Sequence, residues 1–178
     1  MVASAALLIR ERGAQSTAIA DVLAHSGAPR GSAYHYFPGG RTQLLCEAVD
    51  FAAEFVAGRM SKADSGIELL DGLVRFYRKN LIDTEYRAGC PALAVAVESG
   101  EPDQANPVID RADAAFTRWN DLIAQRLIAD GIADDRAEDL AVMATAALEG
   151  AIVLARAARD VKPLDIVHRQ LRALLQAG

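Results

Sequence analysis

The chain has 178 residues, of which 52% are hydrophobic, and its formal net charge is −5. This length suits one large domain, or a small domain joined to a larger one. The charge is uneven, because residues 1–45 carry +2 while residues 46–178 carry −7. We therefore expect two domains, 1–45 and 46–178, and only the first has a charge that suits contact with nucleic acid.

The cysteines and the N-terminal segment bear on the compartment. Cys46 and Cys90 have neither the number nor the spacing of a disulfide framework or a metal site. The apolar segment Met1–Ile9 has no basic residues before it, and Arg10-Glu11-Arg12 interrupts it too early for a signal peptide. No uninterrupted apolar run reaches the roughly 18 residues of a membrane span. We expect a cytoplasmic protein with no cofactor, no metal and no membrane partner.

Apolar residues recur at helical spacing throughout, and no alternating strand pattern is visible, so the predicted fold class is all-α. The expected helices cover about 1–12, 17–25, 29–37, 41–60, 67–86, 91–99, 107–130, 135–159 and 163–176. Residues 61–66 are expected to form a hinge, and residues 100–106 a loop. The pattern predicts a three-helix head joined by a long fourth helix to a helical bundle.

The most specific pattern lies in the head. A short amphipathic helix ends at Ser26-Gly27-Ala28, Pro29 suits the first position of the next helix, and Pro38-Gly39-Gly40 ends that helix after Phe37. Two helices with this spacing are typical of a helix-turn-helix, whose second helix enters the major groove of DNA.

Several side chains of this segment are suited to DNA. Arg30 can contact guanine O6 and N7 or a phosphate, while Tyr34 and His35 can bond phosphate oxygens. Thr17 lies at a helix N-terminus, and Arg41 follows the glycine break, so phosphate contacts are expected from both. The predicted DNA-contacting set is Thr17, Pro29, Arg30, Gly31, Ser32, Tyr34, His35 and Arg41.

Other residues of the segment are expected to support the motif. Ala33 is expected to face outward beside Arg30, and Tyr36 to pack rather than to contact DNA. The predicted core of the head is Ile19, Val22, Leu23, Phe37 and Leu44. Taken singly, arginines on a surface are ordinarily solvated. The joint placement of these residues on one short helix favours the DNA-binding interpretation.

Residues Ser26–Ser32 with Phe37–Gly40 resemble the helix-turn-helix of the TetR-family transcriptional regulators, in the LmrA/YxaF-like branch. Gly89-Cys90-Pro91, followed by an Ala/Val helix, is similar to the C-terminal domain of that branch. The resemblance implies a homodimeric repressor that binds a double-stranded DNA operator and leaves it when a small molecule binds the body. Pro29 stands where the family usually has Ser or Thr. The basic residues that precede the first helix in the family have no counterpart before Met1, so either the native protein has residues before Met1 or its binding of DNA is expected to be weak.

The resemblance also assigns roles within the body. The eighth and ninth helices of two subunits would form a four-helix bundle, and the expected interface residues are Ala144, Leu148, Ala151, Ile152, Ala155, Val167 and Leu171. The same stripe also suits an ordinary core within one chain. The expected ligand pocket is lined by Phe76, Tyr77, Cys90, Phe116 and Trp119, although each of these residues is also typical of a core.

Two other functions compete with this interpretation. An enzyme is disfavoured, because His25, His35 and His168 are scattered and form no Ser/His/Asp, Cys/His or metal-ligand pattern. A helical binding module with a vestigial DNA-binding head is compatible with the negative net charge.

Overall fold

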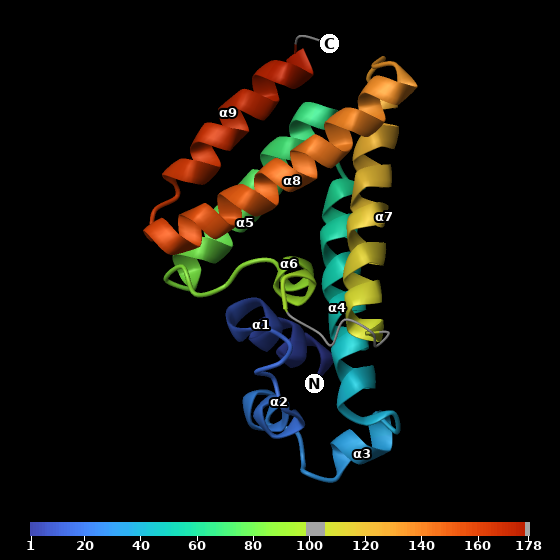
Figure 1. Cartoon of the computed structure of the whole chain (residues 1–178), viewed down its shortest axis with the longest axis vertical. Coiled ribbons are helices and arrows are strands. Elements are labelled where there is room, and N and C mark those ends of the chain that lie inside the picture. The colour runs from blue at the N-terminus through green and yellow to red at the C-terminus, as the bar shows by residue number, and fades with distance from the viewer. Residues whose placement is uncertain (99–105, 177–178) are drawn as a thin grey trace. The chain divides into compact units, whose positions relative to one another are not determined.

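The computed structural model of the chain describes residues 1–98 and 106–176. These residues form helices and no strands, and the expected loop 100–106 lies outside them apart from Asn106. The helices of the described residues are α1 (Val2–Arg12), α2 (Ile19–Ser26), α3 (Ser32–Tyr36), α4 (Gly40–Met60), α5 (Gly66–Asp83), α6 (Pro91–Ala96), α7 (Pro107–Ala129), α8 (Asp134–Ala158) and α9 (Lys162–Gln176) (Figure 1).

The order of the elements confirms the all-α prediction, and most helix ends fall within a residue or two of those expected. α3 is shorter than expected, because Arg30 and Gly31 form a turn before it. α5 ends at Asp83 rather than near Tyr86. Glu85 and Tyr86 take φ values of 51° and 62°, which a right-handed helix does not contain.

The described chain divides into two compact units that differ from the two expected segments. One unit comprises residues 1–54 and 90–115, and the other comprises residues 55–89 and 116–178. α4 and α7 each contribute residues to both units. The unit that contains the helix-turn-helix therefore also contains α6, because α1 packs against α6 as well as α2.

The first unit has an apolar core, and a polar contact links the segment after α1 to the segment after α6. Buried side chains from four helices form its centre: Ala5, Ile9, Val22, Leu44, Leu45, Ala48, Val49 and Val95. Glu98 accepts hydrogen bonds from the Gln15 amide at 3.1 and 3.0 Å. Gly13 ends α1 with φ of 86°, and a Cβ there would lie 2.0 Å from Glu98 Oε1. The backbone angle therefore favours glycine at this position, and a side chain here would also have to displace the end of the Glu98 side chain.

In the second unit, α9 packs against both α8 and α5, as Figure 1 shows. Asp71 of α5 accepts from Arg172 at 2.5 Å and lies 2.7 Å from His168 Nε2, and Arg78 pairs with Asp165. Burial alone would raise the pKa of Asp71, but the hydrogen bonds from Arg172 and His168 outweigh it and hold this pKa below its ordinary value. These ion pairs fix α9 on α5 beside the apolar contact.

α8 is the one described helix that is long and apolar enough to cross a membrane, with a mean hydropathy of 1.6 over its most apolar stretch. The helix reaches this mean hydropathy although polar residues interrupt it, because many of its residues are alanines. Within the protein 44% of that stretch is buried, and residues such as Leu140 and Ile152 belong to the core. The composition of α8 is therefore that of a central helix in a bundle.

Candidate functional site

The turn between α2 and α3 is held by local hydrogen bonds. α2 ends at Gly27, whose φ of 68° is left-handed. Ser26 Oγ accepts from the Ala28 amide at 3.3 Å, and both the amide and the hydroxyl of Ser32 donate to the Pro29 carbonyl, at 3.0 and 2.6 Å. These bonds set the direction in which α3 leaves the turn.

α3 has one buried and one exposed side. Ala33 is 1% exposed and contributes to the core with Phe37, so the expectation that Ala33 faces outward was wrong. Tyr34 is 78% exposed, and Arg30 and His35 are exposed with it. Tyr36 is 64% exposed, so the expectation that it packs was wrong, and its ring lies edge-on to that of His35. The exposed side of the α3 segment thus presents a guanidinium, two phenols and an imidazole.

The structure places Thr17 and Arg41 in internal contacts. Thr17 is 1% exposed and its hydroxyl donates to the Gly13 carbonyl at 2.7 Å. Arg41 Nε donates to the Thr17 carbonyl at 2.9 Å, and its Nη2 donates to the carbonyls of Ala14 and Gln15. Thr17 and Arg41, which were predicted to contact phosphate, therefore hold the segment before α2 through internal hydrogen bonds. Their contact with DNA stays a prediction.

The N-terminus of α2 holds its own carboxylate. The Ala18 amide donates to Asp21 Oδ2 at 3.1 Å, and Arg12 pairs with the same oxygen at 2.9 Å. A carboxylate at this end complements the helix dipole. It also neutralises Arg12, so Arg30 is the more available cation on the surface of the head.

A small cavity lies within the second unit between α4, α5, α7 and α8. Its volume is about 20 Å³, roughly the room needed by one water molecule. It is lined by Val56, Met60, Leu73, Tyr77, Trp119, Ile123, Thr145, Leu148 and Glu149. The Thr145 hydroxyl donates to Asn120 Oδ1 at 2.6 Å, and Glu149 is 8% exposed.

The residues expected to line a pocket are divided by the structure. Tyr77 and Trp119 line the cavity. Phe76 and Phe116 are not in its lining, but their rings contact those of Tyr77 and Trp119, with centroids 5.0 Å and 5.6 Å apart respectively. Cys90 is buried in the other compact unit, before α6.

Two polar residues of the cavity lining, Thr145 and Glu149, were not predicted from the sequence. A signal for them was present, because they lie four residues apart on the apolar stripe of α8. A carboxylate within such a stripe is unusual, since ionised groups are rarely buried.

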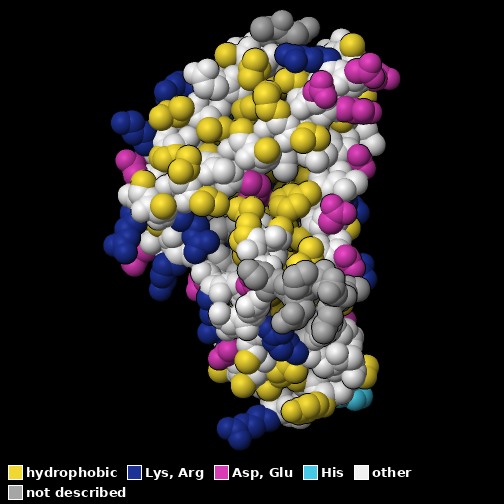
Figure 2. Space-filling model, viewed as in Figure 1, with side chains coloured by type: hydrophobic (Ala, Val, Ile, Leu, Met, Phe, Trp, Pro, Cys, Tyr) yellow, Lys and Arg dark blue, Asp and Glu magenta, His cyan; other side chains and the backbone are white. Residues whose placement is uncertain are grey.

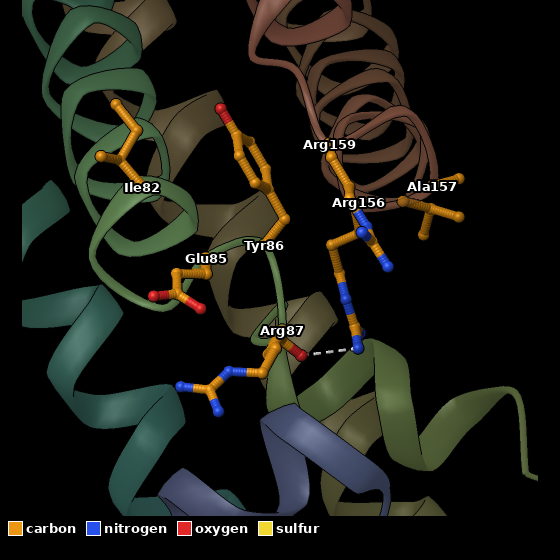
Figure 3. A pocket seen from close by; sticks show the side chains of 8 residues that line it. Ile82, Glu85, Tyr86, Arg87, Arg156, Ala157 and Arg159 are labelled. Carbon is orange, nitrogen blue, oxygen red and sulfur yellow. Dashed lines mark hydrogen bonds between the residues drawn. The ribbon is translucent and has the colours of Figure 1, made fainter.

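A second depression, about 790 Å³ and open to solvent, lies between α8 and the segment after α5 (Figure 3). It is lined by Ile82, Glu85, Tyr86, Arg87, Val153, Arg156, Ala157 and Arg159. Arg156 reaches across and donates to the Arg87 carbonyl at 2.7 Å (Figure 3). A Cβ at Gly89 would lie 3.1 Å from Arg156 Nη1, so the glycine of Gly89-Cys90-Pro91 makes room for this contact. One hydrogen bond thus joins the two sides of this depression.

The expected interface stripe proves to be mainly internal. Six of its seven residues are buried within one chain: Ala144, Leu148, Ala151, Ile152, Ala155 and Leu171. Val167 is half-buried. These residues are internal because α8 needs its small side chains to approach its own neighbours, as in any close helix packing.

A different apolar face of the same two helices is exposed. Its large members are Val142, Met143, Val153, Leu154, Ile166 and Leu174, which are 38% to 59% exposed. Figure 2 shows hydrophobic side chains gathered over α8 and α9. We call this exposed apolar surface the α8–α9 face.

Comparison with known proteins identifies relatives over the whole chain. Residues 66–170 match the family model described as "Transcriptional regulator LmrA/YxaF-like, C-terminal domain". The chain is 66% identical over 180 residues to the uncharacterized HTH-type transcriptional regulator Rv0196 of Mycobacterium tuberculosis (strain ATCC 25618 / H37Rv), covering 99% of this chain and 93% of that protein. It is 26% identical over 168 residues to the HTH-type transcriptional regulator LmrA of Bacillus subtilis (strain 168), covering 92% and 88%.

Solved structures share the fold. The regulatory protein TetR from Rhodobacter sphaeroides superposes with a TM-score of 0.82 at 22% identity, covering 97% of this chain and 95% of that one. A cysteine mutant of the TetR family transcriptional regulator CifR, complexed with 26bp double-strand operator DNA, superposes with a TM-score of 0.76 at 25% identity, covering 97% and 93%.

Proposed function

This chain belongs to the TetR family of DNA-binding transcriptional regulators, in its LmrA/YxaF-like branch, and we propose that it is a cytoplasmic repressor released from its operator by a small apolar or aromatic molecule. The family is not one of enzymes. The observation that carries the proposal is the exposed surface of Arg30, Tyr34 and His35, which follows directly on a helix and a tight turn.

We assign sequence reading to the α3 segment. Arg30 is placed at the N-terminal end, where a guanidinium can contact guanine O6 and N7. Tyr34, His35 and Ser32 offer donors to phosphate oxygens, while Pro29 and Gly31 permit close approach of the backbone. Thr17 and Arg41 act on DNA through the segment that they hold before α2. Any direct phosphate contact of Arg41 would use N–H groups that its carbonyl contacts leave over.

We assign dimerisation to the α8–α9 face. A palindromic operator requires two recognition helices about 34–36 Å apart, which one chain with one helix-turn-helix cannot supply. An exposed patch of large apolar side chains is typical of an interface between subunits. The α8–α9 face offers such a patch. Exposed alanines of α8 and Gly150 lie beside it, and their small size allows a second pair of helices to approach closely.

We assign effector binding to the cavity between α4, α5, α7 and α8. At about 20 Å³ it is closed to any molecule larger than water, so an effector must displace the side chains that line it. Val56 and Met60 belong to α4, the helix that begins directly after the α3 segment. A molecule that binds one arrangement of α4 better than the other shifts the population away from the DNA-binding state by that difference in affinity.

An electrophoretic mobility shift with the DNA flanking the gene tests the proposal. The full-length protein is expected to bind this DNA with an affinity that falls as salt rises, and the Arg30→Ala/Tyr34→Ala variant to lose binding. Arg136→Ala/Ile128→Ala, at exposed positions of α8 and α7 outside the α8–α9 face, is the matched control and should bind as the parent does. Absent or salt-independent binding by the full-length protein would contradict the assignment.

A further inference from the structure

The exposed surface of α8 is acidic at one end of the helix and basic at the other. Its N-terminal end carries one exposed cation, Arg136, and four exposed carboxylates: Asp134, Asp135, Glu138 and Asp139. At its C-terminal end Arg156 and Arg159 line the open depression described above, which Glu85 and Arg87 border from the segment after α5 (Figure 3). Three of the four charged residues in this lining are therefore cations. The two ends of α8 have the charges that an antiparallel pair of these helices would bring together.

The exposed positions of α8 are arranged symmetrically about Leu148. Each exposed position between Glu138 and Ala158 has an exposed counterpart equally far along the helix on the other side of Leu148: Glu138 and Ala158, Asp139 and Ala157, Val142 and Leu154, Met143 and Val153, Ala146 and Gly150. One row of these positions, from Asp139 to Ala157, alternates steps of four and three residues, which is the spacing of helices packed along their length. A two-fold interface requires that each contact occur twice, with the roles of the two subunits exchanged. An antiparallel pair of α8 helices centred at Leu148 satisfies both the spacing and the symmetry.

This register brings the acidic end of each α8 to the basic depression of the other subunit. Val153 and Ala157 belong to the exposed row and also line the depression, so the depression is continuous with the α8–α9 face. The counterpart of Ala157 is Asp139, whose carboxylate would therefore approach the depression beside Arg156 and Arg159. Opposite charges at such a contact favour the correct pairing of two surfaces.

We propose that the depression of each subunit receives the acidic end of its partner's α8, so that Arg159 pairs with the partner's Glu138 and the partner's Asp139 twice in the dimer. This inference rests on the proposed function, in which the α8–α9 face joins two subunits, and it adds a contact beyond the apolar residues of that face. Arg156 adds positive charge while it keeps its hydrogen bond to the Arg87 carbonyl. A parallel pair of α8 helices would place acid against acid and arginine against arginine, so the charges select the antiparallel arrangement.

Charge reversal in the full-length protein tests this pairing. Arg159→Glu alone should weaken the dimer about tenfold or more, and so should Glu138→Arg/Asp139→Arg, because each change makes both contacts of the dimer repulsive. An equimolar mixture of the two variants should dimerise within about threefold of the parent, because both contacts of the mixed dimer again join opposite charges. Sedimentation velocity at several concentrations measures the dimer, and native mass spectrometry identifies the mixed species by its mass.

Arg75→Glu and Asp121→Arg are the matched controls, because they make the same chemical changes at exposed positions of α5 and α7. Each should dimerise as the parent does, and a mixture of the two should show no preference for the mixed dimer. Circular dichroism melting shows whether every variant is folded. Folded reversal variants that dimerise more weakly alone and recover when mixed would support the proposal, since a role of these charges within one chain predicts no recovery.

The outcomes separate this inference from the proposed function. If both reversal variants dimerise as tightly as the parent, or if the mixture dimerises no better than its components, the pairing of the charged ends is overturned. If Leu154→Glu nevertheless yields monomers, the α8–α9 face joins the subunits and only the contact of the charged ends is wrong. If the parent itself is a monomer, the proposed dimerisation fails, and this inference fails with it.

Discussion

Replacement of Arg41 separates two roles that its position allows. In the structure its guanidinium donates to the carbonyls of Ala14, Gln15 and Thr17, which precede α2. Hydrogen bonds to a charged group contribute about 1.5–3 kcal/mol each when they are shielded from water. Arg41 is largely exposed, so we take the lower end of that range for the whole set and expect Arg41→Ala to cost about 2 kcal/mol.

Two assays measure this loss. Hydrogen exchange at the amides of residues 14–18 should accelerate in Arg41→Ala, and urea unfolding followed by circular dichroism gives the free energy of unfolding. Arg41→Lys is the informative control, because it keeps the positive charge but cannot reproduce a planar fork that reaches three carbonyls. It should therefore be destabilised nearly as much as Arg41→Ala.

The opposite result would identify Arg41 as a phosphate contact. In that case the free energy of unfolding of Arg41→Ala would lie within about 0.5 kcal/mol of that of the parent, as is usual for surface substitutions. The slope of log affinity against log salt would become shallower by about 1.8, since each lost phosphate contact contributes about 0.9 and a dimer would lose two. Arg41→Lys would then bind DNA nearly as well as the parent.

Three further outcomes are expected. Asp71→Asn should lower the free energy of unfolding by about 1–2 kcal/mol. Since the pKa of Asp71 is lowered on folding, the parent's advantage should be full above the ordinary value of 3.8 and be lost as pH falls through the lowered pKa of the folded state; an advantage that stays constant between about pH 5 and pH 1 in urea unfolding would contradict the network. Leu154→Glu, at a position 59% exposed on the α8–α9 face, should yield monomers in analytical ultracentrifugation while circular dichroism stays helical, and an unchanged dimer would rule out that face. Gly13→Ala should lower the melting temperature, because it combines a φ of 86° with a clash at Glu98 Oε1, and relief of the defect by Glu98→Ala would show how much the clash contributes.

Local signals account for what the sequence predicted correctly about the head. Gly27, Pro29 and the Pro38-Gly39-Gly40 break fix where helices end and begin, because each acts on the backbone of its own neighbours. The internal contacts of Arg41 were not predictable in this way, since its acceptors lie 24 to 27 residues earlier in the chain. The same holds for the orientation of α3, whose five residues are too few for a reliable periodicity.

In the body, the sequence predicted where the helices lie along the chain more reliably than which of their faces are buried. Small residues on α8 suit close packing against a partner within the chain or in another subunit, and the period of the pattern is the same in both cases. Within this chain α8 packs against α5 and α9, and Ala144, Ala151 and Ala155 are buried. Glu149 was not predicted to line the cavity, because a single carboxylate does not change the helical period of the apolar stripe in which it lies.

The modest charge of the head leads to a last prediction. Of the four arginines in residues 1–45, Arg10 is half-buried, Arg12 is paired with Asp21 and Arg41 is engaged with carbonyls, while Arg30 is exposed. Hydroxyls and imidazole can bind phosphate without adding charge, so they release few counterions. With one or two phosphates neutralised per head, a dimer should show a log–log salt slope of about −1.8 to −3.6.

Such a slope is shallow beside that of a protein that neutralises 6–10 phosphates, roughly −5 to −9. Titration of the flanking DNA at several salt concentrations measures it directly. A slope steeper than about −6 would mean that cations outside the α3 segment carry the contact with the DNA backbone. A shallow slope would mean that binding depends mainly on hydrogen-bond donors on α3 rather than on ion pairs. In that case Tyr34→Phe and His35→Ala should each lower the affinity for DNA while leaving the salt slope nearly unchanged.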